Sequence, residues 1–276
     1  MEILKIMHMS KSYGLYKKKE VLRDINIKID NGKIVGIIGP NGSGKSTLLK
    51  IIAGIINYSS GSINLNGKIG YSPEIPSCYD YLNGYEHLQY INNIIGSHTD
   101  FEDIYNRMGI NDYNGFSKYY SKGMKKRLDI AISLLDNPEL LLLDELFEGL
   151  DFTIANSIID IIKSISKSGI SVILSSHELN YVSILCDEIY MLKDGSLMNY
   201  NKGEKIFKIN FYGNLSKSIT ENKMFKNNIK DLNENYITVN LDKYEISSFI
   251  YLLLSNNIGI TSVEDVTLNN FYEDVK

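Results

Sequence analysis

Residues 39–47 read GPNGSGKST, and this stretch decides the fold of the chain. It contains the spacing G-x-x-x-x-G-K-S, which runs from Gly39 to Ser46. The sequence before it, KIVGIIG (33–39), is short and rich in β-branched residues, and the sequence after it, TLLKIIAG (47–54), has the apolar spacing of a helix. An ordinary glycine-rich turn is the alternative, but a strand, a glycine-rich loop and a helix in this order predict a phosphate-binding loop.

The residue types in this loop suit a polyphosphate. Gly39, Gly42 and Gly44 lack a Cβ, so the backbone can close around phosphate oxygens and direct several N–H groups at them. A helix that begins near Lys45 would add its N-terminal dipole and free N–H groups. Lys45 supplies a cation to the phosphates, and the Ser46 hydroxyl can reach an accompanying Mg²⁺ ion. The expected nucleotide-binding residues of the loop are Gly39, Pro40, Asn41, Gly42, Ser43, Gly44, Lys45, Ser46 and Thr47.

Length and composition limit the classes of protein to consider. The chain has 276 residues, of which 43% are hydrophobic, enough for one large domain or for one domain with a small appendage. A net charge of −4 does not predict a nucleic-acid-binding surface. Cys78 and Cys186 form no CxxC pair, so we expect a reducing compartment and neither a disulfide framework nor a cysteine metal site. Without a signal sequence or an apolar run of about 18 residues, the chain is not expected to span a membrane.

The first 200 residues alternate between sheet and helix patterns. Residues 1–70 contain short β-branched runs between turn signals, whereas 77–120 has weak helical periodicity and predicts a helical insertion. LLLLD (140–144) and ISVILSS (170–176) are continuous apolar runs, as expected for strands covered on both faces of a parallel sheet. An isoleucine stripe over 154–165 predicts a helix between these two strands.

The composition changes after residue 200. Residues 201–234 are rich in Lys and Asn and have little periodicity. NYITVNL (235–241) predicts a strand, and the apolar stripe from Ile246 to Leu253 predicts a helix. A last helix is expected near Leu268–Val275. We therefore expect a linker followed by a small accessory domain.

LLLLDE (140–145) brings two acids to the end of a predicted buried strand. In open α/β sheets, ligands bind beyond the carboxyl ends of the strands. Asp144 would hold Mg²⁺ directly or through water, and Glu145 could act as a general base toward the attacking water. Two solvated acids after a core strand are the alternative, but the position downstream of a phosphate-binding loop favours the functional interpretation.

Together with YSKGMKKRL (120–128), these motifs resemble the ATP-binding-cassette (ABC) transporter ATPase family. In that family a signature segment, usually LSGGQ, opens a helix shortly before the strand that carries the magnesium-binding Asp. Ser121 and Gly123 match the positions that contact the γ-phosphate bound on the opposite subunit, whereas Lys122 and Met124 depart from the usual Gly and Gln. Ser121 can cap the helix and present its hydroxyl to an anion. Without the resemblance, the segment predicts only a capped amphipathic helix.

The resemblance extends to further residues in the family order. His177, in ILSSHE, matches the switch histidine near the γ-phosphate, although a lone His is more often structural. Tyr13, in KSYG, matches the aromatic residue that stacks on adenine, although one Tyr among 20 is weak by itself. Glu74 ends IGYSPE where the family usually has Gln, and its carboxylate could still ligate Mg²⁺ directly or through water. GLD (149–151) matches the loop that communicates between two sites, and Leu146 replaces a common Pro in a change that we expect to be tolerated.

The resemblance covers about residues 1–200 and implies an α/β fold of the P-loop NTPase class, an ABC-type cassette. Such a cassette has a mixed-sheet core, an antiparallel β subdomain and a helical subdomain, here followed by a small α+β C-terminal extension. We place the cassette at 1–204, its helical subdomain at about 77–135, and the linker and accessory domain at 205–276. The implied catalytic residues are Lys45, Glu145 and His177, the implied metal ligands are Ser46, Asp144 and Glu74, and the implied nucleotide contacts outside the loop are Tyr13, Ser121 and Gly123.

The resemblance implies an ATPase, with ATP and Mg²⁺ as cofactors, that converts ATP and water to ADP and phosphate in order to drive a membrane exporter. Two ATPase subunits, identical or different, would enclose ATP head to tail, and a separate transmembrane permease would carry the substrate. Glu74, the SKGMKKR signature and the C-terminal extension look like the branch that exports drugs, antimicrobial peptides or bacteriocins. The expected location is peripheral, on the cytoplasmic face of a bacterial cell membrane.

Two other functions compete with export. One is a soluble, non-transport ABC ATPase with a regulatory role in translation or DNA repair. Translation-type members usually carry two cassettes in one chain and repair types carry long coiled coils, and this sequence has neither. A catalytically silent binding or scaffolding module is the other alternative, and the presence of both Glu145 and His177 argues against it. We therefore expect an exporter subunit that does not bind nucleic acid.

Overall fold

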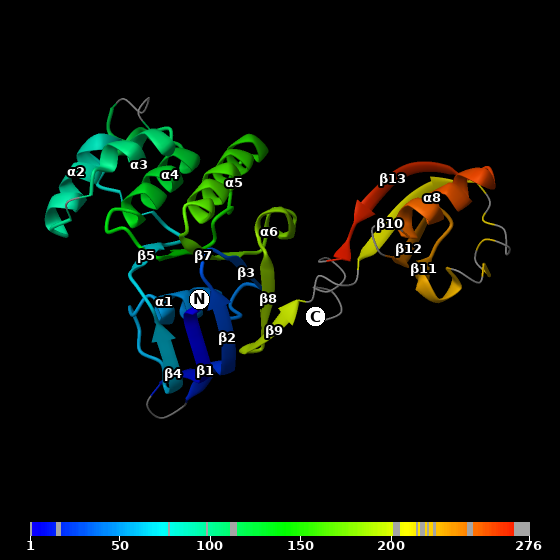
Figure 1. Ribbon diagram of the computed structural model, residues 1–276, viewed down its shortest axis with the longest axis horizontal. Helices are drawn as coiled ribbons and strands as arrows, with labels where there is room; N and C mark the ends of the chain where they lie inside the picture. The colour runs from blue at the N-terminus through cyan, green and yellow to red at the C-terminus, as the bar shows by residue number, and fades with distance from the viewer. Residues whose placement is uncertain are drawn as a thin grey trace. The chain divides into compact units, whose positions relative to one another are not determined.

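In the computed structural model the chain forms two compact units, Met1–Asn199 and Tyr200–Lys276 (Figure 1). The sequence-based division had placed the boundary after residue 204. Every residue that the sequence singled out for the nucleotide site belongs to the first unit. The described residues are 2–14, 18–76, 78–97, 99–110, 115–200, 205–213, 215, 219, 221–222, 225–241 and 245–267.

A six-stranded sheet forms the centre of the first unit, in the order β5-β6-β7-β3-β8-β9. Its first five strands in this order run parallel to their neighbours. Every residue of β3, β6 and β7 is buried, which explains their continuous apolar sequences. The strands are β3 (Ile34–Ile38), β5 (Ile69–Ser72), β6 (Leu140–Leu143), β7 (Ser171–Ser176), β8 (Glu188–Lys193) and β9 (Ser196–Tyr200).

A second, antiparallel sheet has the order β2-β1-β4. Its strands are β1 (Glu2–Tyr13), β2 (Lys19–Asp30) and β4 (Ser60–Leu65). Along β2, buried Ile25, Ile27 and Ile29 alternate with exposed residues, so one face of this sheet is covered and the other is not. The covered face shares one hydrophobic core with β3, β6 and the helix that follows the glycine-rich loop. This core fixes the loop between the two sheets.

The helices of the first unit lie mainly at the end opposite β1, β2 and β4 (Figure 1). The described residues of the expected helical subdomain, about 77–135, form three α-helices and a short 3₁₀ helix. Asn83 and Glu86 form a reciprocal capping box at the start of the first of them. The helices are α1 (Lys45–Ile52), α2 (Gly84–Ile94), α3 (Phe101–Arg107), η1 (Ser117–Tyr119), α4 (Lys122–Ser133), α5 (Phe152–Lys167) and α6 (Leu179–Leu185).

The described residues of the second unit form a four-stranded antiparallel sheet of order β11-β12-β10-β13 and one long helix. The expected strand and helix are present as β12 and α8, whose Phe249 and Leu253 are fully buried in the core of this unit. Residues 201–234, which have little sequence periodicity, nevertheless contain two strands, β10 and β11. The elements are β10 (Ile206–Tyr212), η2 (Lys226–Asn228), β11 (Ile229–Leu232), β12 (Tyr236–Asn240), α8 (Glu245–Ser255) and β13 (Gly259–Asp265).

β10 escaped detection because its buried residues do not alternate: Ile206, Ile209 and Phe211 are buried, with two partly buried residues between the first pair. The strand is nevertheless internal, paired with β12 on one side and β13 on the other. Pairing on both edges, which a single sequence does not show, therefore determines its structure. The helix expected near Leu268–Val275 lies outside the described residues.

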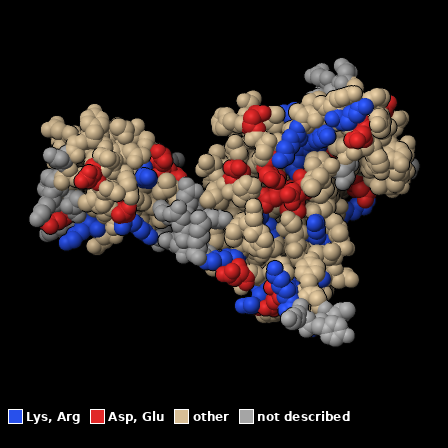
Figure 2. Space-filling view, turned by 180° about the vertical axis from the view of Figure 1, so that it is seen from behind, with Lys and Arg blue, Asp and Glu red and all other residues tan. Residues whose placement is uncertain are grey.

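The surface carries mixed charge. Figure 2 shows basic side chains in several separate groups on the visible face, with acidic side chains gathered between them. Within the described part of the chain, no helix combines the length and the hydrophobicity that a membrane span requires.

Candidate functional site

The glycine-rich loop joins β3 to α1. Neither the start of α1 nor one buried hydroxyl group of the loop has a side-chain hydrogen-bond partner among the described residues. Gly44 adopts a left-handed conformation, with φ of 109°, and no side chain caps the helix that follows it. A Cβ on Gly39 would collide with the backbone carbonyl of Leu192, so only glycine fits there. The Ser43 hydroxyl oxygen is buried without a hydrogen-bond partner among the described residues. An uncapped helix start and an unpaired hydroxyl are the features expected of a loop built to hold an anion.

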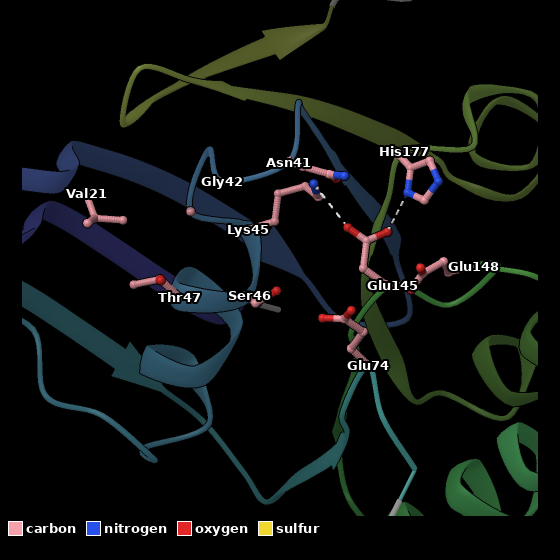
Figure 3. A pocket seen from close by; sticks show the side chains of 11 residues that line it. Val21, Asn41, Gly42, Lys45, Ser46, Thr47, Glu74, Glu145, Glu148 and His177 are labelled. Carbon is pink, nitrogen blue, oxygen red and sulfur yellow. Dashed lines mark hydrogen bonds and ion pairs between the residues drawn. The ribbon is translucent and has the colours of Figure 1, made fainter.

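Lys45 lies at the start of α1 and is only 4% exposed. Its Nζ donates hydrogen bonds to the carbonyl oxygens of Gly39, at 2.9 Å, and of Pro40, at 3.3 Å. The same ammonium forms an ion pair with Glu145 Oε1 at 3.1 Å (Figure 3). The loop therefore holds a buried cation beside the carboxylate that was expected to act as the base.

Asp144 follows β6 and is almost fully buried among hydroxyl groups. Its Oδ1 accepts hydrogen bonds from Ser46 Oγ at 3.0 Å and from Ser175 Oγ at 2.7 Å. Its Oδ2 accepts one from the Tyr71 hydroxyl at 3.3 Å. Burial and the nearby Asp144 charge raise the pKa of Tyr71, so its phenol remains a donor at neutral pH.

Ser46 and Asp144 supply the kind of oxygen atoms that Mg²⁺ prefers. Among the described residues there is no group of three or more His, Cys, Asp or Glu side chains that could hold a metal by themselves. Mg²⁺ in nucleotide sites is commonly held by one or two protein oxygens together with phosphate oxygens and waters. The pair therefore fits a metal that arrives with a nucleotide.

Glu145 links the loop to the end of β7. One carboxylate oxygen contacts Lys45, and the other, Oε2, lies 3.0 Å from His177 Nδ1 (Figure 3). The residue has φ of 43°, a left-handed conformation that is uncommon outside glycine. Strain of this kind concentrates at functional sites. The carboxylate is 9% exposed at the edge of the pocket, so it can reach a water molecule there.

These residues line a pocket of about 340 Å³ beside the loop. Figure 3 shows Glu74 pointing its carboxylate into the space between Ser46 and Glu145. Sequence reasoning missed two lining residues, Val21 and Glu148. Glu148 follows the acidic pair closely enough to have been suspected, whereas nothing in β2 marked Val21. The lining residues are Val21, Asn41, Gly42, Gly44, Lys45, Ser46, Thr47, Glu74, Glu145, Glu148 and His177.

The three expected nucleotide contacts outside the glycine-rich loop do not line this pocket. Tyr13 does not line this pocket, and its 43% exposed ring has Lys11 Nζ at 4.6 Å from its centroid. Ser121 caps α4 as expected, because its hydroxyl accepts a hydrogen bond from the Met124 N–H at 3.2 Å. Gly123 is buried, and a Cβ there would lie 2.6 Å from Ile154 Cγ2. A side chain at Gly123 would therefore force the half-buried Ile154 side chain of α5 to shift.

A buried lysine that the sequence did not single out lies beneath the pocket. Lys126 is 4% exposed, and its Nζ donates hydrogen bonds to the carbonyl oxygens of Pro73, at 3.1 Å, and Asp144, at 3.0 Å. Burial lowers the pKa of Lys126, although the charges of Asp129 and Asp144 partly oppose this effect. Leu146 also contributes a contact, since its N–H donates to the Ser175 carbonyl at 3.2 Å.

Comparison with known proteins agrees with this geometry. Residues 22–148 match the family model described as ABC transporter. The lantibiotic transport ATP-binding protein SrtF of Streptococcus pyogenes is 37% identical over 207 residues, which cover 71% of this chain and 89% of that protein. The linearmycin resistance ATP-binding protein LnrL of Bacillus subtilis is 30% identical over 215 residues, which cover 71% of this chain and 68% of that protein. A solved structure of an ATP-binding subunit of an ABC transporter superimposes with a TM-score of 0.64 at 27% identity, covering 72% of this chain and 90% of that one.

Proposed function

This chain belongs to the ABC transporter family as an ATP-binding, ATP-hydrolysing subunit, and on that premise we propose that it powers the export of a peptide antibiotic through a separate membrane subunit. The observation that carries the ATPase role is the position of Glu145, held between Lys45 and His177 at the wall of the pocket. The name of SrtF, which refers to lantibiotic transport, supports a peptide cargo, and the name of LnrL, which refers to linearmycin resistance, supports antibiotic export more generally. These relatives favour export over a soluble, non-transport ATPase.

Each part of the pocket has a role in hydrolysis under this proposal. Lys45 turns its ammonium from the loop carbonyls to the β- and γ-phosphates, where it offsets negative charge. Mg²⁺, held by Ser46 and Asp144 with Glu74 nearby, supplies further charge neutralisation when it is bound. Glu145 accepts a proton from water as the water oxygen attacks the γ-phosphorus and the bond to the β–γ bridging oxygen breaks. His177 holds the Glu145 carboxylate in place through its 3.0 Å contact.

A second ATPase subunit, identical or different, completes the site in this proposal. Ser121 and Gly123 lie at the start of α4 and do not line the pocket of their own chain. A capped helix start with free N–H groups can bind an anion presented by another subunit. We therefore assign these two residues to the pocket of the partner subunit. Separately, the family resemblance of Tyr13 supports a place beside the adenine.

The test uses the full chain with a tag and the substitution Glu145→Gln, which is expected to retain ATP and to stabilise the closed assembly. Membranes of the native host are extracted in mild detergent with Mg·ATP, and the co-purifying proteins are identified. Co-purification of a polytopic membrane protein supports the exporter role, whereas a soluble partner in its place would contradict it.

The cargo class is tested in cells. A strain that lacks this chain is expected to become more sensitive to an added lantibiotic, and the intact gene, but not its Lys45→Ala version, is expected to restore resistance. Unchanged sensitivity to lantibiotics would contradict the proposed cargo while leaving the ATPase role intact.

A further inference from the structure

The peptide group between Asp144 and Glu145 is held from both sides. Its carbonyl oxygen accepts a hydrogen bond from Lys126 Nζ at 3.0 Å, and its N–H donates to Ser175 Oγ at 2.8 Å. Lys126 comes from α4 and Ser175 from β7, so two separate elements fix the orientation of one peptide plane. Both anchoring side chains are buried, which shields these hydrogen bonds from water.

This peptide group has to be held because Glu145 is strained. Its φ of 43° describes the rotation about the bond that joins this peptide plane to the Glu145 Cα. A non-glycine residue in the left-handed region gains free energy by rotating back to negative φ. That rotation would carry the carboxylate away from Lys45 and His177, which it now contacts at 3.1 and 3.0 Å. The hydrogen bonds to this peptide group oppose this relaxation together with the next peptide group, whose Leu146 N–H donates to the Ser175 carbonyl at 3.2 Å.

Lys126 makes a second contact of the same kind. Its Nζ donates to the Pro73 carbonyl at 3.1 Å, one residue before Glu74, another acid that lines the pocket. One ammonium group therefore ties α4 to the two backbone segments that carry Glu74 and Glu145. A buried ammonium is costly unless it is paired and hydrogen-bonded, and here Asp129 and Asp144 provide the opposing charge.

We propose that Lys126 is a positioning residue for ATP hydrolysis, which holds the Asp144–Glu145 peptide group in the orientation that keeps the Glu145 carboxylate at the pocket. The inference rests on the proposed role of Glu145 as the general base. Lys126 does not contact the nucleotide in this account. Its loss should therefore affect the chemical step and leave nucleotide binding largely intact.

The test is the substitution Lys126→Met in the full chain, which keeps the length of the side chain and removes its donors. The kcat for Mg·ATP hydrolysis is expected to fall by about ten- to a hundred-fold. This range follows from the loss of the charge-assisted hydrogen bond that Lys126 donates to the Asp144 carbonyl. The equilibrium Kd for ATP is expected to stay within about two-fold of wild type. Lys126→Gln, which keeps a neutral donor, should recover part of the loss. Lys167→Met, on the exposed last turn of α5, is the matched control and should leave kcat unchanged.

A double-substitution cycle separates positioning from a merely structural role. Adding Lys126→Met to Glu145→Gln should lower the residual rate by less than about two-fold, because the base is already absent. The proposal is overturned if Lys126→Met lowers kcat by the same factor in the wild-type and Glu145→Gln backgrounds, or if folded Lys126→Met has an unchanged kcat. It is also overturned if the Kd for ATP rises by the same factor by which kcat falls. If Lys126→Met does not fold, Lys126→Gln is measured in the same cycle under the same criteria. Full turnover by Glu145→Gln alone would instead reject the role of Glu145.

Discussion

Replacement of Gly123 by Ala tests the packing that was found beneath the signature segment. A Cβ at this position would lie 2.6 Å from Ile154 Cγ2 and 2.9 Å from Ile154 Cδ1, both closer than carbon atoms approach each other in proteins. Overpacking of this kind costs about 1–3 kcal/mol, because side chains or backbone must shift. Alanine regains part of this cost, up to about 0.5–1 kcal/mol, because it is a better helix former than glycine.

The net expectation for Gly123→Ala is a loss of about 1 kcal/mol in the free energy of unfolding, within a range of about 0–2.5 kcal/mol. For a unit of this size, each kcal/mol corresponds to roughly 2–4 °C in Tm, so the Tm should fall by about 2–4 °C. Denaturant titration and calorimetry without nucleotide measure both quantities. In an Ile154→Ala background the same substitution should cost nothing or stabilise slightly, because the atoms that the new Cβ would meet are gone.

Equal destabilisation by Gly123→Ala in both backgrounds, or none in either, would show that Ile154 does not limit the space at Gly123. The ATPase rate of the double variant gives separate information. If stability returns and hydrolysis does not, Gly123 has a role in the nucleotide site in addition to its role in packing.

Three further outcomes are expected. Lys45→Ala should raise the Kd for ATP at least about ten-fold in an equilibrium binding assay, because the buried ammonium is the charge provided for the phosphates; wild-type affinity would remove Lys45 from the site. Leu146→Pro should fold but lose about 1 kcal/mol or more of unfolding free energy, since proline cannot donate to the Ser175 carbonyl; equal stability in denaturant titrations would contradict this. His87 is buried, with Nε2 accepting the Tyr79 N–H and Nδ1 bound to the Asn83 carbonyl, and burial lowers its pKa below 6.5. The unfolded state therefore binds more protons than the folded state, so the free energy of unfolding should fall as the pH drops below about 6.5. Denaturant titrations of wild type and His87→Gln between pH 7.5 and 5.5 measure this. An equally steep fall in the two proteins would contradict the role of His87.

Two substitutions serve as controls for these measurements. His8→Gln, at an exposed histidine of β1, should keep the pH dependence that His87 causes. Lys50→Ala, on the last turn of α1, should leave the Kd for ATP unchanged.

The local parts of the site could be predicted from the sequence because each is a short continuous signal. Neighbours in the chain determine the loop from Gly39 to Thr47, the strand that directly precedes Asp144 and the cap at Ser121. The expectation that Glu145 and His177 both lie near the γ-phosphate came from the resemblance to a family. Nothing in the sequence itself states that the ends of β6 and β7 are adjacent.

The parts that could not be predicted depend on contacts between distant segments. A lysine in a helix sequence predicts a solvated side chain, and Lys126 is buried only because the carbonyls of Pro73 and Asp144 converge on it. Gly123 could be assigned to a phosphate contact by resemblance, but its packing requirement comes from Ile154 on another helix. In the same way, β10 is a strand because it pairs on both edges, which its own pattern does not show.

The central claim is that the pocket hydrolyses ATP with Glu145 as the base. The most direct measurement compares wild type and Glu145→Gln in the same preparation, with ATP binding and phosphate release followed side by side. With Glu145 as the base, the ATP affinity of Glu145→Gln should stay within about two-fold of wild type and its turnover should fall by about 10²- to 10⁴-fold, the range for loss of a general base. Undiminished phosphate release by Glu145→Gln would exclude Glu145 as the base.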